Sequence, residues 1–259
     1  MKIATWNVNS IKARLETVLT WFEHARPDVA CLQELKCVDE AFPRAEFERL
    51  GYNVETHGQK TYNGVALLSR LPIEDVRRRL PGDEADEQAR YLEAVVLGDE
   101  PVRIASLYAP NGNPIGTEKF AYKLAWMKRL QGHARELLQL EEPLVLCGDY
   151  NVIPEPEDAD KPQTWVTDAL FTPEARAEFR ALKWLGLTDA YKQIDGRPNV
   201  YTFWDYQMGA FRRNHGIRID HHLLSPQAAD RLRGCEIHKE TRGWDKPSDH
   251  VPVVIELDL

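Results

Sequence analysis

The sequence predicts an α+β fold in which stacked β-sheets carry helices on their outer faces. Helix-like and strand-like segments follow one another without the strict alternation that a simple parallel α/β sheet requires. Many of the strand-like segments are short. Hydrophobic residues make up 43% of the 259 residues, which is enough to build a core and excludes a mainly disordered chain.

The elements can be predicted in order along the chain. A strand-like segment at 1–6 is followed by apolar residues that recur at helical spacing over 11–22, with Ser10 as the expected N-cap and an end near Pro27. A long helix is predicted over 120–137, after Thr117. Another begins at Thr172, which stands before a proline at the first helical position. Further strands are predicted over 29–32, 64–68, 102–107, 144–147, 217–224 and 251–257.

Charge and composition indicate how these elements are exposed. The net charge of −8 argues against DNA binding over the whole surface but allows one local basic face. Residues 74–100 hold nine acidic and four basic side chains, so we expect them to face water and avoid DNA. Residues 153–162, rich in proline and acid, are expected to form a surface loop. Because no linker or repeat interrupts the pattern, residues 1–259 are expected to form one domain.

The cysteines and the termini bear on the compartment. Four cysteines without zinc-like spacing exclude a disulfide scaffold and favour a reducing environment. We find no signal-peptide pattern and no apolar run of about 18 residues, so we expect a cytoplasmic protein without a membrane span. Cys147 is expected to be buried. The tryptophans expected in the core are Trp6, Trp21, Trp126 and Trp184.

Polar side chains follow several predicted strands, at the points where the strands end. Strand ends are positions at which a rigid sheet can hold side chains around one cleft. If these strands are neighbours, the side chains converge. The residues concerned are Asn7, Gln33, Glu34, Tyr108, Asp149, Asn151, Asp220, Ser248, Asp249 and His250.

The residue types in this set are those of a metal-dependent phosphoryl-transfer site. Asn7 and Glu34 offer oxygen ligands, which suit Mg²⁺ or Mn²⁺ better than zinc, and no H-E-x-x-H motif is present. Asp220 and His250 can form a carboxylate–imidazole pair that orients the ring and favours its charged form. A P-loop ATPase is excluded because the chain has no G-x-x-x-x-G-K-[ST] motif.

Taken together, these segments resemble the motif set of the endonuclease/exonuclease/phosphatase superfamily. The segments are WNVN at 6–9, LQE at 32–34, GDYN at 148–151, GIRID at 216–220 and SDH at 248–250. Two further segments, YTFWDY at 201–206 and PSDH at 247–250, make the chain similar to the DNA-repair branch, the exodeoxyribonuclease III and apurinic/apyrimidinic endonuclease family. The resemblance covers essentially the whole chain.

The resemblance implies a four-layer sandwich of the deoxyribonuclease I type, in which two packed mixed β-sheets are flanked by helices. It also implies single-step, metal-dependent attack of water on a phosphodiester. The implied partner is double-stranded DNA with an abasic site or a 3′ end, and the implied cofactor is Mg²⁺, with Mn²⁺ as the alternative. Nothing in the sequence points beyond a monomer.

Metal-binding roles follow from the same resemblance. Glu34 would be the main metal ligand, with Asn7 beside it and Asp249 supporting the metal side. Asn9 stands where the eukaryotic-type enzymes carry aspartate, so one carboxylate fewer is expected at the metal, as in the bacterial exonuclease type.

The resemblance also implies catalytic roles. Tyr108 and His250 would contact phosphate oxygens, and Asp220 would hold His250 in place. Asp149 would handle the proton of the attacking water or of the leaving group, and Asn151 would orient the water or the phosphate. The sequence leaves open whether Asp149 or His250 is the general base.

Substrate contacts are implied for a further set of residues. An apolar pocket for a flipped abasic sugar, too small for an intact base, would consist of Phe203, Trp204, Ile217 and Ile219. Ile217 replaces the aromatic wall of some relatives, which leaves the balance of endonuclease and exonuclease activity open. Residues 203–222 hold three arginines against two aspartates and are a candidate phosphate-binding face, to which His215, His221 and His222 would add inducible charge. The expected DNA contacts are Asn111, Tyr206, Gln207, Met208, Arg212, Arg213 and Arg218.

The sequence also allows ordinary structural roles for these residues and other functions for the chain. Asp149 and Asn151 also suit an Asx-turn, and Tyr201 and Trp204 suit core packing. The arginine run 77–79 is more typical of a solvated strand end. The alternative functions are a metallophosphatase for a small phosphoester such as an inositol phosphate, and a catalytically silent binding module.

Overall fold

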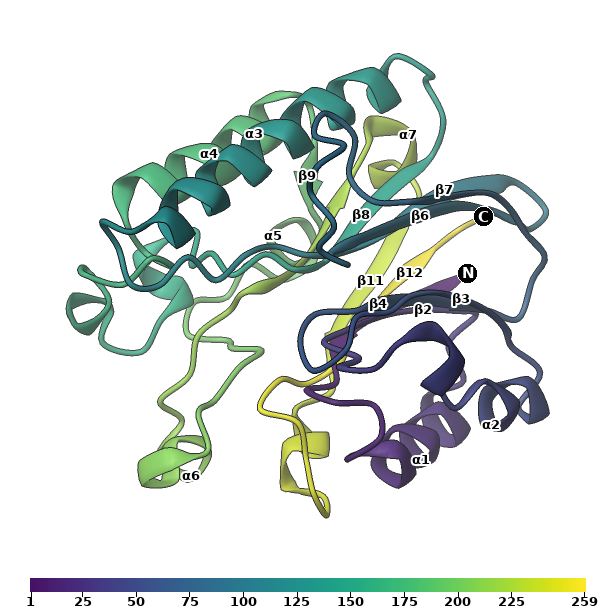
Figure 1. The fold of residues 1–259 in the computed structure, drawn as a ribbon, viewed down its shortest axis with the longest axis horizontal. Coiled ribbons are helices and arrows are strands. Elements are labelled where there is room, and N and C mark those ends of the chain that lie inside the picture. Colours follow the sequence, from purple (N-terminus) through teal and green to yellow (C-terminus); the bar gives the residue numbers. More distant parts are fainter.

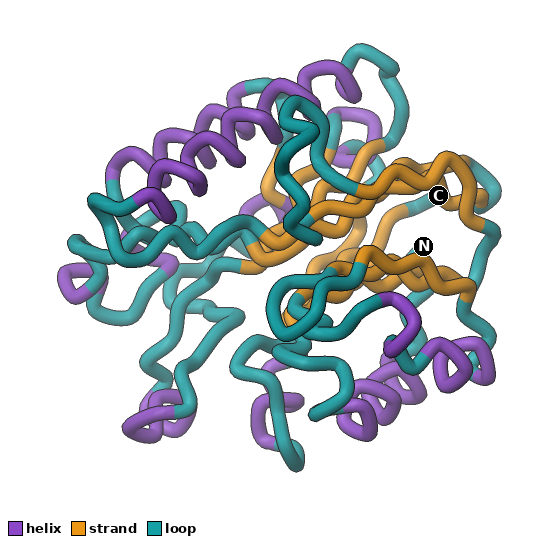
Figure 2. Tube along the Cα trace, in the orientation of Figure 1, coloured by secondary structure: helices purple, strands orange, loops and turns teal.

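Two six-stranded β-sheets face each other in the computed structural model, which describes all residues 1–259. Helices cover the outer face of each sheet (Figure 1). Figure 2 shows the same layers, with strands in the middle and helices outside. The predicted four-layer sandwich is therefore confirmed.

The first sheet holds the N- and C-terminal strands, and its strand order is β11-β12-β1-β2-β4-β3. β1 and β2 run parallel, with Asn7 opposite Gln33, so both strands end at the same edge. Two helices, α1 (Leu15–Ala25) and α2 (Arg44–Arg49), cover its outer face (Figure 1). The strands are β1 (Lys2–Asn7), β2 (Val29–Gln33), β3 (Asn53–His57), β4 (Val65–Ser69), β11 (Leu232–Ile237) and β12 (Val253–Leu257).

The second sheet has the order β5-β6-β7-β8-β10-β9. Asp149 at the end of β8 pairs with Tyr108 of parallel β7 and with Asp220 of antiparallel β10. Two long helices, α3 (Glu118–Leu138) and α4 (Pro173–Trp184), cover its outer face (Figure 1). The strands are β5 (Ile73–Arg78), β6 (Tyr91–Leu97), β7 (Pro101–Tyr108), β8 (Leu144–Asp149), β9 (Thr188–Asp189) and β10 (Asp220–Leu224).

Short helical turns occupy the connections. The α-helical ones are α5 (Ala190–Ile194), α6 (Ala210–Arg213) and α7 (Pro226–Ala229). The 3₁₀ turns are η1 (Asp39–Ala41), η2 (Pro156–Asp158), η3 (Pro162–Thr164), η4 (Gln207–Gly209) and η5 (Lys239–Gly243). None of the helices combines the length and the apolar character needed to cross a membrane.

Alternation along the strands divides the core into layers. In β1, Ile3 faces the second sheet while Ala4 and Trp6 face α1, because successive side chains of a strand point to opposite sides. Burying one large apolar side chain stabilises the fold by about 1.5–3 kcal/mol. Trp126 of α3 packs in the layer over the second sheet. Cys147 is fully buried between the sheets, as predicted.

The predicted helix starts were correct in one case and wrong in another. Thr172 caps α4, since its hydroxyl accepts a hydrogen bond from Ala175 N at 3.2 Å. α1, however, begins at Leu15, and Ser10 does not cap it. Asn9 and Ser10 have left-handed backbone conformations, with φ of 44° and 85°, so the chain makes a turn there before the helix starts.

Two segments expected at the surface are partly buried. Within 74–100, β5 is an exposed edge strand, but β6 is an inner strand whose Glu93 is buried against His133, with 2.6 Å between carboxylate oxygen and Nε2. Within 153–162, Asp158 is buried and paired with Arg218. The net charge of a segment therefore failed to predict the burial of Glu93 and Asp158, because a side chain from another element pairs with each carboxylate.

The expectation of a core tryptophan at 184 was wrong, whereas Trp6, Trp21 and Trp126 are buried as predicted. Trp184 is 81% exposed. Phe179 and Leu182 of α4 face the core, and Trp184 lies two residues beyond Leu182, on the outer side of the helix.

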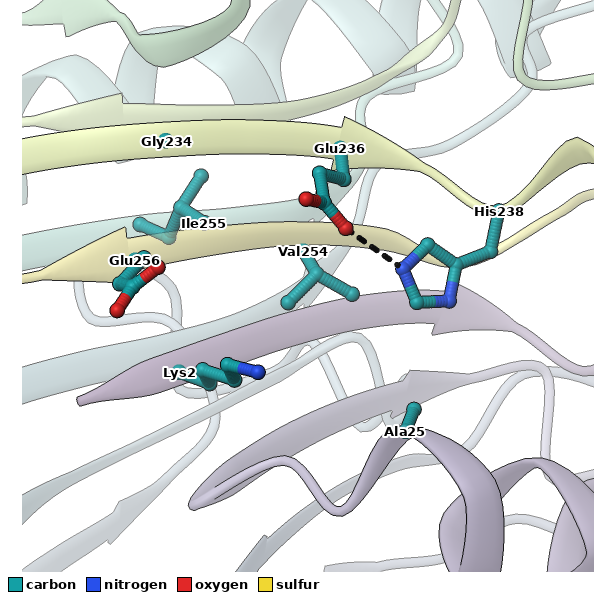
Figure 3. A pocket seen from close by; sticks show the side chains of 8 residues that line it. All are labelled: Lys2, Ala25, Gly234, Glu236, His238, Val254, Ile255 and Glu256. Carbon is teal, nitrogen blue, oxygen red and sulfur yellow. Dashed lines mark ion pairs between the residues drawn. The ribbon is translucent and has the colours of Figure 1, made fainter.

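A small hollow of about 70 Å³ lies between α1 and the strands β1, β11 and β12 (Figure 3). His238 and Glu236 stand at one end, with 3.5 Å between Nε2 and a carboxylate oxygen. Trp21 of α1 donates a hydrogen bond to His238 Nδ1 at 3.0 Å. The contacts of His238 link α1 to the first sheet. None of the predicted site residues lines this hollow.

Candidate active site

Six polar side chains predicted from strand ends come together at one edge of the sandwich. They come from both sheets and from the loop before β12, and a hydrogen bond from Asn7 to Asp149 links the sheets across 142 positions of sequence. The parallel pairs β1–β2 and β7–β8 explain the convergence, because their C-terminal ends lie at the same edge. The six residues are Asn7, Glu34, Tyr108, Asp149, Asp220 and His250.

Asn7 stands between two carboxylates. Its Nδ2 donates to Glu34 Oε1 at 2.9 Å and to Asp149 Oδ2 at 3.0 Å. Its Oδ1 accepts from Asn9 N at 3.0 Å. The Tyr108 hydroxyl donates to the same Glu34 oxygen at 2.9 Å. Asn7 and Tyr108 therefore both stabilise the negative charge of Glu34, and the same charge would attract a metal cation.

Glu34 is held as a carboxylate. Burial opposes its ionisation, but hydrogen bonds from Asn7 and Lys36 outweigh this effect and lower the pKa of Glu34. Lys36 Nζ lies 2.8 Å from Glu34 Oε2 and also donates to Asn9 Oδ1 at 2.5 Å. Glu34 and Lys36 both have left-handed backbones, with φ of 54° and 55°, which turns the chain sharply after β2.

His250 lies between two aspartates. Its Nδ1 is 2.9 Å from Asp220 Oδ2, and its Nε2 is 3.7 Å from Asp149 Oδ2. Burial disfavours the imidazolium, but the two carboxylates outweigh it and raise the pKa of His250 to about 10. The Phe203 ring covers the imidazole edge-on, with ring centres 4.9 Å apart.

Asp149 has a pKa near neutrality. Burial raises the pKa of Asp149 to about 7, with His250 opposing the rise and Asp220 adding to it. A group with such a pKa can both accept and release a proton near physiological pH.

Asn151 and Asn111 lie beside Asp149. Asn151 N donates to Asp149 Oδ1 at 2.8 Å, which is the Asx-turn contact considered from the sequence. Asn151 Nδ2 donates to Ala109 O at 2.9 Å, and Asn111 Nδ2 donates to Asn151 Oδ1 at 3.3 Å. The Asx-turn is thus present, and it positions the Asn151 side chain next to the carboxylate cluster.

The carboxylates provide a plausible chemistry for Mg²⁺ or Mn²⁺. One ligand atom each from Glu34, Asp149 and His250 lies within 4.8 Å of the others. Carboxylate oxygens suit a hard divalent cation, whereas a protonated imidazole cannot ligate one. The donor set therefore fits a metal on the carboxylate side, with His250 kept for another role.

Asp249 and Gln33 lie outside this cluster. An Asp249 carboxylate oxygen accepts from Asn9 Nδ2 at 3.1 Å and from Ser248 Oγ at 3.3 Å. Gln33 is buried between the sheets and donates to Ser106 Oγ at 3.1 Å. The structure thus shows Asp249 bonded within the loops that border the site.

The four residues expected to form an apolar pocket do not all pack together. Ile217 and Ile219 are buried in an apolar cluster against which the half-buried Phe203 packs. Trp204 belongs to a different cluster, with Tyr201 and Val251, and is fully buried. The pocket role expected for Trp204 is therefore corrected to core packing: its ring lies on the other side of the segment, with Nε1 3.3 Å from Asn214 Oδ1.

Arg218 was expected at a DNA-binding surface, and the structure corrects this. Its side chain is only 1% exposed, and its guanidinium lies 2.9 Å from Asp158 and 3.0 Å from Asp189. His221 and His222 are buried too, and burial lowers their pKa values to about 4 and about 3. They stay neutral and add no inducible charge.

The other residues expected to contact DNA are exposed. Tyr206 is about half exposed, and its hydroxyl accepts from Asn9 Nδ2 at 3.3 Å, while Met208 projects into solvent. Arg90 and Lys119 were not predicted, yet they line a hollow of about 590 Å³ that also includes Tyr108 and Asn111. The exposed predicted residues are Asn111, Tyr206, Gln207, Arg212 and Arg213.

Two lysines at the site were missed from the sequence. Lys36 follows Glu34 by two residues, a spacing that could have suggested an ion pair across the turn. Lys123 interrupts the apolar side of α3 and is fully buried, its Nζ bonded to three backbone carbonyls. A lysine within an otherwise apolar helical stripe is the signal that was available.

The mostly buried cluster of carboxylates, an amide and a histidine at one edge of the two facing sheets has the groups that a metal-dependent phosphoesterase needs. The sequence matches the model of the Endonuclease/Exonuclease/phosphatase family over residues 4–250. The chain belongs to this family.

Three relatives match this chain over their whole length. It is 34% identical to exodeoxyribonuclease III of Haemophilus influenzae, covering 99% of this chain and 100% of that protein. An AP endonuclease structure from Archaeoglobus fulgidus is 38% identical with a TM-score of 0.95, and both chains are fully covered. A Neisseria 3′ phosphatase bound to a product DNA hairpin has the same TM-score of 0.95, 38% identity and full coverage of both chains.

Proposed function

We propose that this chain is a metal-dependent DNA-repair nuclease that cleaves 5′ to abasic sites and acts on 3′ ends of duplex DNA, removing nucleotides and blocking groups. One observation carries the proposal. Asp149 touches Asn7, which also binds Glu34, and faces His250, which is held by Asp220. This places a proton-handling carboxylate between a candidate metal ligand and a cation. The relatives reported above, an exodeoxyribonuclease, an AP endonuclease and a 3′ phosphatase, support the substrate class.

In the proposed mechanism, Asp149 is the residue that accepts or donates the proton. With a pKa near 7, its carboxylate takes a proton from the attacking water or returns one to the leaving oxygen. Asn151 is bonded to Asp149 through its backbone, and one N–H of its side chain bonds Ala109 O. Its second side-chain N–H would be offered to the same water or phosphate. The variant Asp149→Asn tests whether Asp149 handles a proton in the reaction.

The phosphate would be held by fixed donors. His250, kept protonated by Asp220 and Asp149, offers a charged N–H. The single O–H of Tyr108, which donates to Glu34 in this structure, would turn to the phosphate as a second donor. Glu34, with Asn7 beside it, would hold the Mg²⁺ or Mn²⁺, which when bound supplies positive charge at the phosphate. Asn7 and His250 are buried, and His250 is already oriented by Asp220, so this cation needs little reorganisation during the reaction.

The surroundings of the site suit a DNA backbone. On one side, the hollow containing Tyr108 holds the cations Arg90 and Lys119. On the other, Arg212 and Arg213 are exposed in α6. Cations on both sides of a buried phosphate-binding cluster fit a duplex lying across the edge of the sandwich. The clustered residues bond to one another within a single chain, and we propose that a monomer is active.

The test uses two labelled duplexes, one with a single abasic site and one intact with a recessed 3′ end, each with Mg²⁺ and with EDTA. We expect incision 5′ to the abasic site and shortening of the recessed strand, both abolished by EDTA. If neither duplex is cut with Mg²⁺ or Mn²⁺ while a small phosphoester is hydrolysed, the chain is a metallophosphatase. If no phosphoester is hydrolysed, the binding-module alternative holds.

A further inference from the structure

A lysine is buried directly beneath the candidate active site. Lys123 of α3 is 0% exposed. Its Nζ donates to the backbone carbonyls of Asn151 at 2.6 Å, Asn111 at 3.0 Å and Ala169 at 3.0 Å. An ammonium group has three N–H donors and an uncharged amine has two. Three acceptors around one nitrogen therefore match the charged form.

Burial and these acceptors act in opposite directions on Lys123. Burial lowers the pKa of Lys123 to about 7, while the negative charges of Asp149 and Asp168 oppose the fall. Three carbonyl oxygens pointing at the nitrogen supply the stabilisation that a buried charge needs, because each replaces a lost water contact.

The three carbonyls belong to three separate segments. Asn111 follows β7, Asn151 follows β8, and Ala169 lies in the segment that leads to α4. The first two also meet through their side chains, Asn111 Nδ2 to Asn151 Oδ1 at 3.3 Å. Lys123 Nζ thus bonds the backbone carbonyls of both asparagines and links the two segments through one nitrogen.

The backbone at Asn151 needs such support. Its φ is 48°, in the left-handed region, which costs roughly 1–2 kcal/mol for an ordinary residue and less for asparagine. In this conformation its carbonyl points into the protein and would be unsatisfied without Lys123. A buried carbonyl without a partner costs about 1–3 kcal/mol.

The loop after β7 is shaped around the lysine stem. Gly112 has a φ of 86°, and a Cβ at this position would lie 2.6 Å from Lys123 Cδ. Only glycine allows the Asn111 carbonyl to approach Lys123 Nζ this closely. The loop and the lysine are therefore fitted to each other.

We propose that Lys123 is a positioning residue of the nuclease reaction: its side-chain nitrogen sets the placement of Asn151 and Asn111 relative to Asp149. The inference rests on the proposed function. Lys123 does not touch the reacting atoms in this arrangement; it acts through the two asparagines. Its loss should therefore lower kcat more than it changes KM.

The experiment compares Lys123→Met and Lys123→Arg with the matched control Lys128→Met. Lys128 lies on the same helix, but its side chain is 67% exposed and pairs only with Glu178, at 3.9 Å. We expect Lys123→Met to lower kcat on the recessed duplex by about 10- to 100-fold, the range for a slightly misplaced catalytic group, with KM changed less than about threefold. Lys123→Arg should recover part of kcat, and Lys128→Met should match the wild type.

A second readout separates positioning from stability. The side-chain amide NMR signals of Asn111 and Asn151, assigned with Asn→Asp variants, should shift in Lys123→Met and stay in place in Lys128→Met. A folded Lys123→Met protein with wild-type kcat and unshifted signals would overturn the inference. If Lys123→Met does not fold, Lys123→Gln, which keeps one donor group, takes its place. A wild-type kcat in Lys123→Gln would also overturn the inference. An inactive wild type would count against the proposed function, and the NMR comparison would still test the placement.

Discussion

His250 Nδ1 lies 2.9 Å from Asp220 Oδ2, and both side chains are buried next to Asp149. Asp220 is itself oriented, because the Thr202 hydroxyl donates to Oδ2 at 2.6 Å. The ring therefore has one allowed orientation, in which Nε2 faces Asp149. This arrangement makes His250 a cation in the folded protein and an ordinary histidine in the unfolded chain.

The stability of the protein should consequently depend on pH through His250. Its pKa is about 10 when folded, against about 6.5 for an unfolded histidine. The folded state then binds one more proton, so this stabilisation is complete below about pH 6.5 and is lost as the pH rises through 10. In EDTA and in an Asp149→Asn background, we expect the free energy of unfolding to fall between pH 7.5 and 9.5 more steeply with His250 present than with His250→Gln, by at most about 1.4 kcal/mol per pH unit.

Urea unfolding at several pH values measures this difference. The Asp149→Asn background is needed because Asp149, with a pKa of about 7, adds a slope of the same sign. Removing the His250 cation, which opposes the rise of this pKa, would move the Asp149 titration into the window. Parallel curves for the two proteins between pH 7.5 and 9.5 would show that His250 is not charged in the folded state.

Replacing Asp149 should remove most of the turnover. Asp149→Asn keeps the size of the side chain and can still meet Asn7, but it cannot take up a proton near neutral pH. We expect kcat to fall by about 10² to 10⁴, the range for losing a general acid or base. Single-turnover cleavage of the abasic duplex measures the loss, with circular dichroism to confirm folding. Full turnover in this variant would remove the proton-handling role.

Removing the buried Arg218 should cost stability. Arg218→Met leaves Asp158 and Asp189 buried without their main cation, although Lys192 Nζ remains 3.2 Å from Asp158. We expect a loss of about 3–5 kcal/mol in urea unfolding, the range for breaking a buried ion pair. The exposed Arg212→Met is the control and should stay within about 0.5 kcal/mol of the wild type. Equal stabilities of the two variants would contradict the structural role of Arg218.

Arg212 should instead contribute to DNA affinity. If it contacts one phosphate, Arg212→Ala lowers the slope of log K against log salt by about 0.9. Fluorescence anisotropy with a labelled duplex in EDTA, at several salt concentrations, gives this slope. Arg135→Ala, an exposed arginine of α3, is the control and should keep the wild-type slope. An unchanged slope for Arg212→Ala would remove α6 from the DNA-binding surface.

The site could be predicted from the sequence to the extent that it depends on strand ends. Asn7, Glu34, Tyr108 and Asp149 each follow a run of apolar residues, and parallel pairing of β1 with β2 and of β7 with β8 brings their side chains to one edge. Local hydrophobic patterning was sufficient here because it marks where a buried strand stops.

The remaining contacts depend on partners that are distant in sequence. Arg218 looked like a surface cation because Asp158 and Asp189, which neutralise it, lie 60 and 29 positions away. β6 looked exposed because the acidic loop before it dominates the composition of 74–100. The apolar stripe around Lys123 indicated that this lysine is buried, but its role could not be predicted, since its acceptors are backbone carbonyls of three other segments.

The sequence by itself determined the layered α+β architecture, the main strands and helices, and the residue types gathered at the strand ends. These depend on apolar periodicity and on short motifs, both of which are local. The tertiary structure alone decided which charged side chains are buried, which tryptophan is exposed, and how His250 and Asp149 divide their protons. Those properties depend on the distance between groups from different elements, because burial and neighbouring charge act through space rather than along the chain.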